Sequence, residues 1–293
     1  MKANEDSAEP FELIAADRLT PLVYAAPHSG RWMPPGAGAD LQAGEATVRS
    51  LEDPRVDALI AGAAARGAAT IINGTARAFV DVNRDPAEMD PDLLITGRPG
   101  DRRTPRTRAG LGVVPRLGGD GQPLWRRPFQ VEELRARVDQ VHASYHAALA
   151  GLMADARAQF GRAVLIDWHS MPSVAAMAEQ RRGGLRPDIV IGDRHGQSAD
   201  PALARIVRTA FEARGRRVIM NRPFAGGYTT QLWARPADGF HALQIEIDRS
   251  LYLDERTLEP GPGFDALRRD IDLVGAALSA ALGTKKAAPE SAA

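Results

Sequence analysis

The sequence contains no cysteine, no long apolar run and no net charge, and each absence excludes a class of function. Without cysteine the chain has no disulfide, no thiolate nucleophile and no cysteine-type zinc site, so any metal must be bound by histidine and carboxylate. No apolar run approaches the roughly 18 residues of a membrane-spanning helix. The 37 basic and 37 acidic side chains balance, which argues against nucleic acid or an anionic membrane as the main partner.

The remaining composition is typical of a globular enzyme. Hydrophobic residues make up 44% of the 293 residues, enough for a sizeable buried core. The polar residues 1–7 lack the apolar core of a signal peptide, so a cytoplasmic location is expected. We expect a single domain over residues 11–283, with flexible tails at 1–10 and 284–293.

Strand-like and helix-like stretches alternate along the chain. This alternation favours an α/β fold in which helices cover both faces of a mixed, mostly parallel sheet. The predicted strands are 21–27, 69–73, 78–82, 163–168, 188–192, 216–220 and 242–248, and the predicted helices are 54–66, 129–160, 201–214 and 264–282.

Residues 98–127 differ from the rest because they are rich in Arg, Gly and Pro. This composition predicts a long solvated loop, and long ordered loops in enzymes often serve as lids over active sites. The arginines could attract an anionic substrate. No aromatic series lies among them, which argues against nucleic-acid binding.

Two histidines at the ends of apolar runs are the most informative feature. His28 follows the run 21–27, and His169 follows the run 163–168. Both runs are typical of short buried strands, and functional groups of α/β proteins collect just past the carboxyl ends of strands. Neutral imidazole is the commonest metal ligand. The two histidines therefore predict one metal site built from distant parts of the chain.

Carboxylates accompany these histidines in the sequence. Asp167 shares a strand face with His169, so it can orient the imidazole or bind the metal itself. Glu52 and Asp53 lie just before a predicted helix. Their alternative role is an ordinary helix start, because Asp is a preferred N-cap and Pro54 suits the first turn.

A second histidine pair lies on the predicted helix 129–160. His142 and His146 are four residues apart, as in zinc-binding helices. A zincin places Glu directly after the first His, whereas this chain has Ala143. The pair is therefore predicted to lie at the margin of an amphipathic helix.

Two further segments carry candidate functional residues. Glu246 lies in an alternating apolar strand, where a carboxylate is costly to bury unless it is paired or bound. It is a candidate general base or metal ligand, and an ion pair with Arg249 is the alternative. Asn83 and Arg84 end another apolar run, and the planar guanidinium suits a substrate carboxylate. A structural pair of Arg84 with Asp81 or Asp85 is equally compatible with the sequence.

Taken in order, these segments resemble the N-formylglutamate amidohydrolase family. The similar blocks run from about residue 21 to residue 253; each is short, but their shared order is specific. They are Pro27-His28-Ser29-Gly30, Glu52-Asp53, Asp81-Val82-Asn83-Arg84, Asp120-Gly121-Gln122-Pro123-Leu124, Asp167-Trp168-His169-Ser170, Pro187 to Gly192, Gly226-Gly227-Tyr228-Thr229-Thr230 and Gln244-Ile245-Glu246-Ile247.

The resemblance implies a zinc-dependent deformylase, related to zinc carboxypeptidases and acyl-amino-acid deacylases and active in histidine degradation. It implies a three-layer α/β/α fold and one Zn²⁺ held by two histidines and a carboxylate. On this chain the ligands would be His28, His169 and Asp53, with Glu52 as the alternative carboxylate. Glu246 would be the base.

The resemblance also implies how the substrate is bound, and here the chain departs from the family. Asn83 and Arg84 match the pair that binds the substrate carboxylate. In the Gly-Gly-x-x-Thr-x block, where the family has histidine and arginine, this chain has Tyr228 and Gln231. The loss of a cationic residue indicates a different acyl-amino acid, unless an arginine of 98–127 binds the second carboxylate.

The implied reaction is amide hydrolysis of an N-formyl or similar N-acyl amino acid, such as N-formylglutamate. The expected partner is therefore a small anionic N-acyl amino acid, and no oligomeric state is implied. The alternatives on the sequence alone are a broader N-acyl-amino-acid deacylase, a carboxypeptidase-like hydrolase and a non-catalytic protein that binds anionic metabolites. A structural metal site is disfavoured, because only three protein ligands are expected.

Overall fold

A computed structural model describes residues 10–16, 19–96 and 104–283. The contacts divide the chain into two compact units, each assembled from three segments. Unit 1 falls within residues 1–12, 27–53 and 72–149, and unit 2 within residues 13–26, 54–71 and 150–293.

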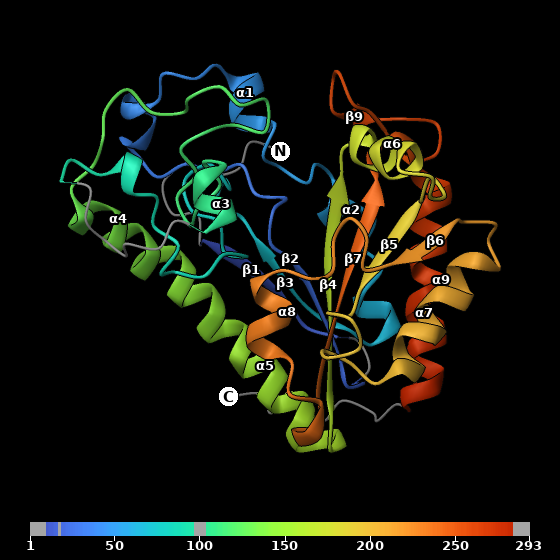
Figure 1. The fold of residues 1–293 in the computed structure, drawn as a ribbon. Coiled ribbons are helices and arrows are strands. Elements are labelled where there is room, and N and C mark those ends of the chain that lie inside the picture. The colour runs from blue at the N-terminus through green and yellow to red at the C-terminus, as the bar shows by residue number, and fades with distance from the viewer. Residues whose placement is uncertain (1–9, 17–18, 97–103, 284–293) are drawn as a thin grey trace, which may run out of the picture. The chain divides into compact units, whose positions relative to one another are not determined.

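A seven-stranded mixed sheet lies almost entirely in unit 2 (Figure 1), with the strand order β1-β3-β2-β4-β7-β5-β6. β2, β4 and β7 run parallel to one another, β5 is antiparallel to β7, and β6 is parallel to β5. A separate pair, β8 (Leu253–Asp254) and β9 (Glu259–Pro260), forms a short hairpin. The sheet strands are β1 (Phe11–Ile14), β2 (Leu22–Ala26), β3 (Ala69–Asn73), β4 (Ala163–Met171), β5 (Ile189–Gly192), β6 (Val218–Met220) and β7 (Phe240–Asp248).

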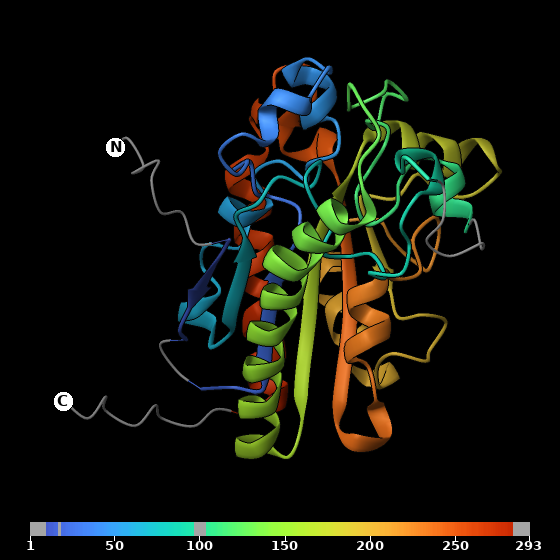
Figure 2. The same ribbon diagram turned by 90° about the vertical axis from the view of Figure 1, so that its left-hand side faces the viewer.

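Helices lie on both faces of this sheet (Figures 1 and 2), which confirms the predicted α/β fold. α8 and the second half of α5 lie on one face, and α2, α7 and α9 lie on the other. In the part of the chain that the structure describes, no helix combines the length and apolar character needed to cross a membrane. The helices of unit 2 are α2 (Val56–Leu59), α6 (Ser173–Arg181), α7 (Pro201–Glu212), α8 (Tyr228–Trp233), α9 (Phe264–Leu282) and the end of α5 (Ser144–Phe160).

The strands β2 and β4 are buried along their whole length, as strands covered on both faces must be. Trp168 packs edge-on against Tyr24 at a centroid distance of 5.4 Å. A Cβ at Gly275 of α9 would lie 3.0 Å from the Tyr24 hydroxyl, so this is the face that α9 covers. Asp167 and His169 alternate with Trp168 and therefore point to the opposite face, the one that carries α8.

Unit 1 contains short helices and long packed loops. Its helices are α1 (Glu45–Arg49), α3 (Pro105–Arg108), α4 (Val131–Arg137), a π-helix (Val138–Ala143) and the start of α5. The predicted helix 129–160 is thus one helical stretch interrupted by a π-helix. The predicted helix 54–66 is broken: only α2 and the 3-10 helix Ala64–Arg66 form there.

The prediction of a strand at 78–82 is wrong. These residues form turns and coil, although Ala78, Val80 and Val82 are fully buried. The segment is apolar because it is buried within unit 1, and an apolar run alone cannot distinguish a buried coil from a strand. The strands β1, β8 and β9 and the helices α1, α3, α6 and α8 were not predicted at all.

The arginine-rich stretch is not the solvated loop that its composition predicts. Residues 97–103 lie outside the described part, but Val113, Val114 and Leu124 are fully buried. The arginines are used in pairing: Arg116 Nε lies 2.8 Å from the Asp90 carboxylate. Buried apolar side chains anchor this stretch. The sequence did not reveal them, because they are few and lie among many Gly, Pro and Arg residues.

Candidate active site

The loop that follows β2 carries His28 and is fixed by backbone contacts. The Asn73 side chain donates to the carbonyl of Pro27 (2.8 Å), and the Asp53 amide donates to the carbonyl of His28 (2.9 Å). A Cβ at Gly30 would lie 2.3 Å from the carbonyl carbon of Gly74, so only glycine fits here. These contacts place Asp53 beside His28.

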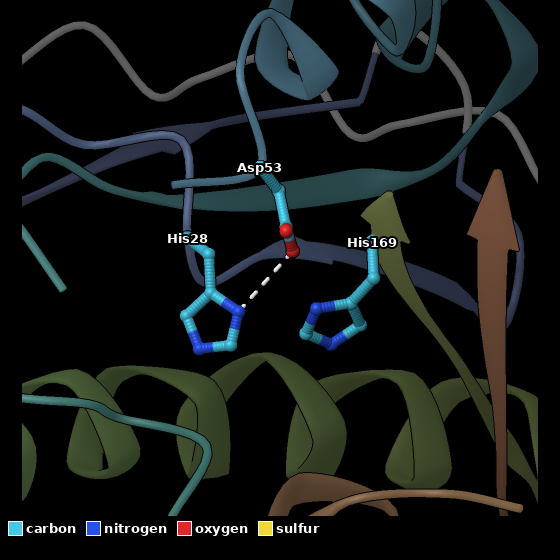
Figure 3. Close-up of side chains that lie close together, drawn as sticks. All are labelled: His28, Asp53 and His169. Atoms are coloured by element: carbon cyan, nitrogen blue, oxygen red, sulfur yellow. Dashed lines mark hydrogen bonds and ion pairs between the residues drawn. The ribbon is translucent and has the colours of Figure 1, made fainter. Parts of the chain in front are cut away.

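Three buried side chains form a group that could hold a metal ion. One potential ligand atom from each of His28, Asp53 and His169 lies within 4.8 Å of the others. Figure 3 shows the carboxylate of Asp53 between the two imidazole rings. Two histidine nitrogens and one carboxylate oxygen suit Zn²⁺, and three protein ligands leave a fourth position open for water or substrate.

His28 itself supports a cation at this position. Its Nε2 lies 2.8 Å from Asp81 Oδ1, and its Nδ1 lies 3.2 Å from Asp53 Oδ2. A neutral imidazole donates from one nitrogen only, so if Nε2 donates to Asp81, the Nδ1 lone pair faces a carboxylate. A cation between the Nδ1 lone pair and the Asp53 carboxylate would make this contact favourable.

From the sequence, Asp81 was expected only as a possible partner of Arg84. It is buried, and it accepts from Arg77 Nε (2.8 Å) and from the Asn83 amide (2.8 Å) in addition to His28. Burial raises its pKa, but Arg77, Arg84 and His28 outweigh burial and hold the pKa of Asp81 well below its usual range. A permanently charged Asp81 fixes the ring of His28, as carboxylates do for metal-binding histidines.

Glu52 and Asp53 have different surroundings, although they are adjacent and both buried. Glu52 Oε2 accepts from Arg31 Nε (3.2 Å) and Arg49 Nε (3.4 Å). Burial raises the pKa of Glu52, and the two arginines oppose this rise. It is Asp53 that lies with His28 and His169, whereas Glu52 pairs with arginines.

The strands β4 and β7 align the remaining polar side chains. In their parallel register His169 is paired with Glu246, and Asp167 is paired with Gln244, so all four point to the α8 face. Asp167 Oδ2 lies 3.1 Å from His169 Nε2. Gln244 donates to Glu246 Oε1 (2.8 Å) and accepts from the amide of Gly227 (2.7 Å). Gln244 was not predicted as a site residue, although its strand parity with Glu246 was visible.

Arg249, the residue predicted as an alternative partner of Glu246, follows β7 and contacts Ser170 of β4. Its Nε donates to Ser170 Oγ (3.1 Å), and its Nη2 donates to the carbonyl of Ser170 (3.3 Å). Ser170 lies near the end of β4 and Arg249 directly follows β7, so these bonds tie β4 to the turn after β7.

Asn83 and Arg84 lie in the buried coil of unit 1. Arg84 donates from Nε to the carbonyl of Leu111 and from Nη1 to the carbonyl of Asn83, both at 3.0 Å. Burial lowers the pKa of Arg84 to about 10, and the charge of Asp81 opposes this shift. The guanidinium therefore remains protonated at neutral pH and has a fixed orientation.

Tyr228 and Gln231 lie on α8 in unit 2, with Tyr228 half-buried and Gln231 exposed. The bond from the Gly227 amide to Gln244 ties the start of α8 to the strand that carries Glu246. His142 and His146 are buried in unit 1 rather than at a helix margin.

The sequence and the fold match proteins of a known family. The family model for N-formylglutamate amidohydrolase matches residues 20–253. An N-formylglutamate deformylase of Pseudomonas aeruginosa is 31% identical over 239 residues, covering 80% of this chain and 83% of that protein. One from Pseudomonas putida is 32% identical over 172 residues, covering 58% of this chain and 63% of that protein.

A solved structure extends the match over nearly the whole chain. The crystal structure of an N-formylglutamate amidohydrolase from Ralstonia eutropha superimposes with a TM-score of 0.86 at 30% identity, covering 94% of this chain and 99% of that one. The chain therefore belongs to the N-formylglutamate amidohydrolase family, a family of enzymes that hydrolyse amides.

Proposed function

We propose that this protein is a zinc-dependent deformylase that hydrolyses the amide of an N-formyl amino acid such as N-formylglutamate. The observation that carries the proposal is the buried group of His28, Asp53 and His169, with Glu246 in register beside His169. The names of the relatives from Pseudomonas aeruginosa and Ralstonia eutropha support the substrate class. The family resemblance further suggests a cytoplasmic role in histidine degradation.

Zn²⁺ fits the nitrogen and oxygen donors of this group, and Asp81 and Asp167 hold the two histidines in place. When bound, Zn²⁺ would polarise the formyl carbonyl and lower the pKa of a water molecule to roughly 7.

Glu246 is the proposed general base. Its carboxylate accepts the proton of the attacking water and passes it to the amine that leaves. Gln244 holds Oε1 of this carboxylate with an amide hydrogen bond of 2.8 Å, and the bond from Gly227 in turn holds Gln244. Gln244 lies in the sheet and Gly227 lies at the start of α8. These two hydrogen bonds therefore fix the orientation of the base before substrate binds.

Asn83 and Arg84 are the proposed binding groups for the α-carboxylate of the substrate. The bonds that fix the Arg84 guanidinium reduce the conformational entropy lost on binding, so binding energy serves orientation. Tyr228 and Gln231 are proposed to contact the side chain of the amino acid. Neither is cationic, so the second candidate function is a broader N-acyl-amino-acid deacylase.

A substrate panel on zinc-loaded protein tests the proposal. N-formylglutamate, N-formylglutamine, N-formylmethionine, N-acetylglutamate and a dipeptide would be compared by kcat/KM. We expect the formyl compounds to be cleaved at least tenfold faster than the acetyl compound. Hydrolysis of N-formylglutamate should release one glutamate for each formate. A protein that binds no zinc and cleaves none of these compounds would be a binding protein, and preference for the dipeptide would identify a carboxypeptidase-like enzyme.

A further inference from the structure

One helical stretch of unit 1 holds the coil that carries Asp81 and Arg84. Residues 79–84 lie outside every helix and strand, so no ladder of backbone bonds fixes them. Single backbone bonds, such as that from the Asp81 amide to the carbonyl of Val113 (2.8 Å), are supplemented by side chains. The contacts join the Arg137 guanidinium to the Phe79 ring (4.7 Å to the centroid), His142 Nε2 to the carbonyl of Arg84 (2.9 Å) and His146 Nε2 to the carbonyl of Val82 (2.8 Å).

The π-helix Val138–Ala143 explains how these three side chains reach one segment. Residues five apart in an ideal α-helix point about 140° away from each other. In a π-helix the backbone bond joins residues five apart, which brings Arg137 and His142 toward the same face. His146, four residues further in α5, continues that face. The wider turn of the π-helix thus lets one face of the helical stretch follow the coil.

Both histidines act as hydrogen-bond donors to the coil. A carbonyl only accepts, so Nε2 of each ring carries a proton. Both rings are buried, and their centroids lie 4.5 Å apart. Burial and, to a lesser extent, the neighbouring His142 lower the pKa of His146 to about 4, while the bond to Val82 opposes the shift. Burial also lowers the pKa of His142. Both rings are therefore neutral donors at neutral pH.

One bonded carbonyl belongs to the residue after Asp81, and the other belongs to Arg84 itself. Val82 directly follows Asp81, whose carboxylate lies 2.8 Å from His28 Nε2. The Arg84 carbonyl belongs to the residue proposed to bind the substrate carboxylate. We propose that His146 and His142 are separate positioning residues: His146 holds Asp81 on the metal ligand His28, and His142 holds Arg84 for the substrate. The His142 half of this proposal depends on the proposed function, whereas the His146 half depends only on metal binding.

Four single variants test the two roles. His146→Leu and His142→Leu remove the donor, whereas His146→Gln and His142→Gln keep an amide N–H near the position of Nε2. We expect His146→Leu to weaken zinc affinity about tenfold, measured by competition with a chelator, with KM for N-formylglutamate little changed. We expect His142→Leu to raise that KM about tenfold with zinc affinity unchanged, since about 1.4 kcal/mol of positioning is lost. Each Gln variant should recover most of its own loss.

The controls separate positioning from packing. His241→Gln alters a half-buried histidine of unit 2 and should change neither zinc affinity nor KM. If the Leu variants do not fold, His146→Asn and His142→Asn replace them, because the shorter amide cannot reach the carbonyls. Equal losses in both folded variants without recovery in the Gln variants would overturn the proposal, as would no loss in either. If the wild-type protein cleaves no N-formyl compound, the proposed function fails, and the zinc measurements alone decide the role of His146.

Discussion

The strands β4 and β7 and the coil 79–84 both carry candidate site residues, but they fix them by different means. In the strands, the parallel register sets His169 beside Glu246 and Asp167 beside Gln244 through backbone bonds. In the coil, single backbone bonds such as that from the Asp81 amide to Val113 are supplemented by side-chain hydrogen bonds and charges, which hold Asp81 and Arg84. Backbone bonds of a sheet do not depend on which side chain is present, whereas the coil depends on each of its partners. A substitution in the strands should therefore change chemistry alone, and one in the coil should also change stability.

The largest effect is expected at the strand residue Glu246. Glu246→Gln removes the proposed base but keeps the shape, and its amide can still pair with Gln244. We expect kcat to fall by roughly 10³-fold, with zinc content and melting temperature unchanged because the register holds β7. Steady-state kinetics, metal analysis and a thermal melt measure the three quantities. A fully active variant would exclude Glu246 as the base, and a large loss of stability would contradict the comparison of strand and coil.

The next largest effect is expected in the coil, at Asp81. Asp81→Asn keeps an acceptor for His28 but removes the charge that faces Arg77 and Arg84. We expect zinc affinity to fall about 10- to 100-fold and the free energy of unfolding to fall by about 3 kcal/mol, because two partly buried guanidinium groups lose a buried partner. Chelator competition and urea denaturation of the metal-free protein measure the two losses. Normal stability in this variant would show that the coil does not depend on its charges.

The sequence predicted the strand residues of the site better than the coil residues. Apolar runs identified six of the seven sheet strands, and strand parity indicated that Asp167 shares a face with His169. Such patterns suffice because a strand repeats every two residues. The run 78–82 shows the limit, since its apolar residues record burial in a coil rather than a strand. Asp81 contacts His28 across 53 residues of sequence, and no local pattern predicts such a contact. Likewise, the carbonyls that His142 and His146 contact could not be identified before the fold of unit 1 was known.

Acid should destabilise the coil through His146. Its pKa is lowered to about 4 in the folded protein, mainly by burial, whereas an unfolded histidine titrates near 6.5. Between these values the unfolded chain binds more protons, so the free energy of unfolding falls as the pH is lowered from 6.5 to 4. We expect a contribution of up to about 3 kcal/mol over this range. His142 adds to the loss in the same direction, with Asp81 and Asp85 opposing its own shift.

His146→Gln provides the matched control, because glutamine keeps the donor and does not titrate. Urea denaturation of the metal-free wild type and variant at several pH values between 4 and 7 gives the difference in slope. The variant should lose less stability than the wild type as the pH falls. Parallel curves for the two proteins would show that His146 does not resist protonation in the folded state.

The smallest effect is expected at Asp167, the strand counterpart of Asp81. Asp167→Asn keeps an acceptor 3.1 Å from His169 Nε2 in the wild-type geometry, but the neutral amide no longer raises the basicity of the imidazole. We expect zinc affinity to fall about tenfold. The melting temperature should remain close to that of the wild type, since β4 is held on both sides by β2 and β7. A stability loss as large as that of Asp81→Asn would mean that burial of the charge, rather than strand or coil, decides how each site residue is held.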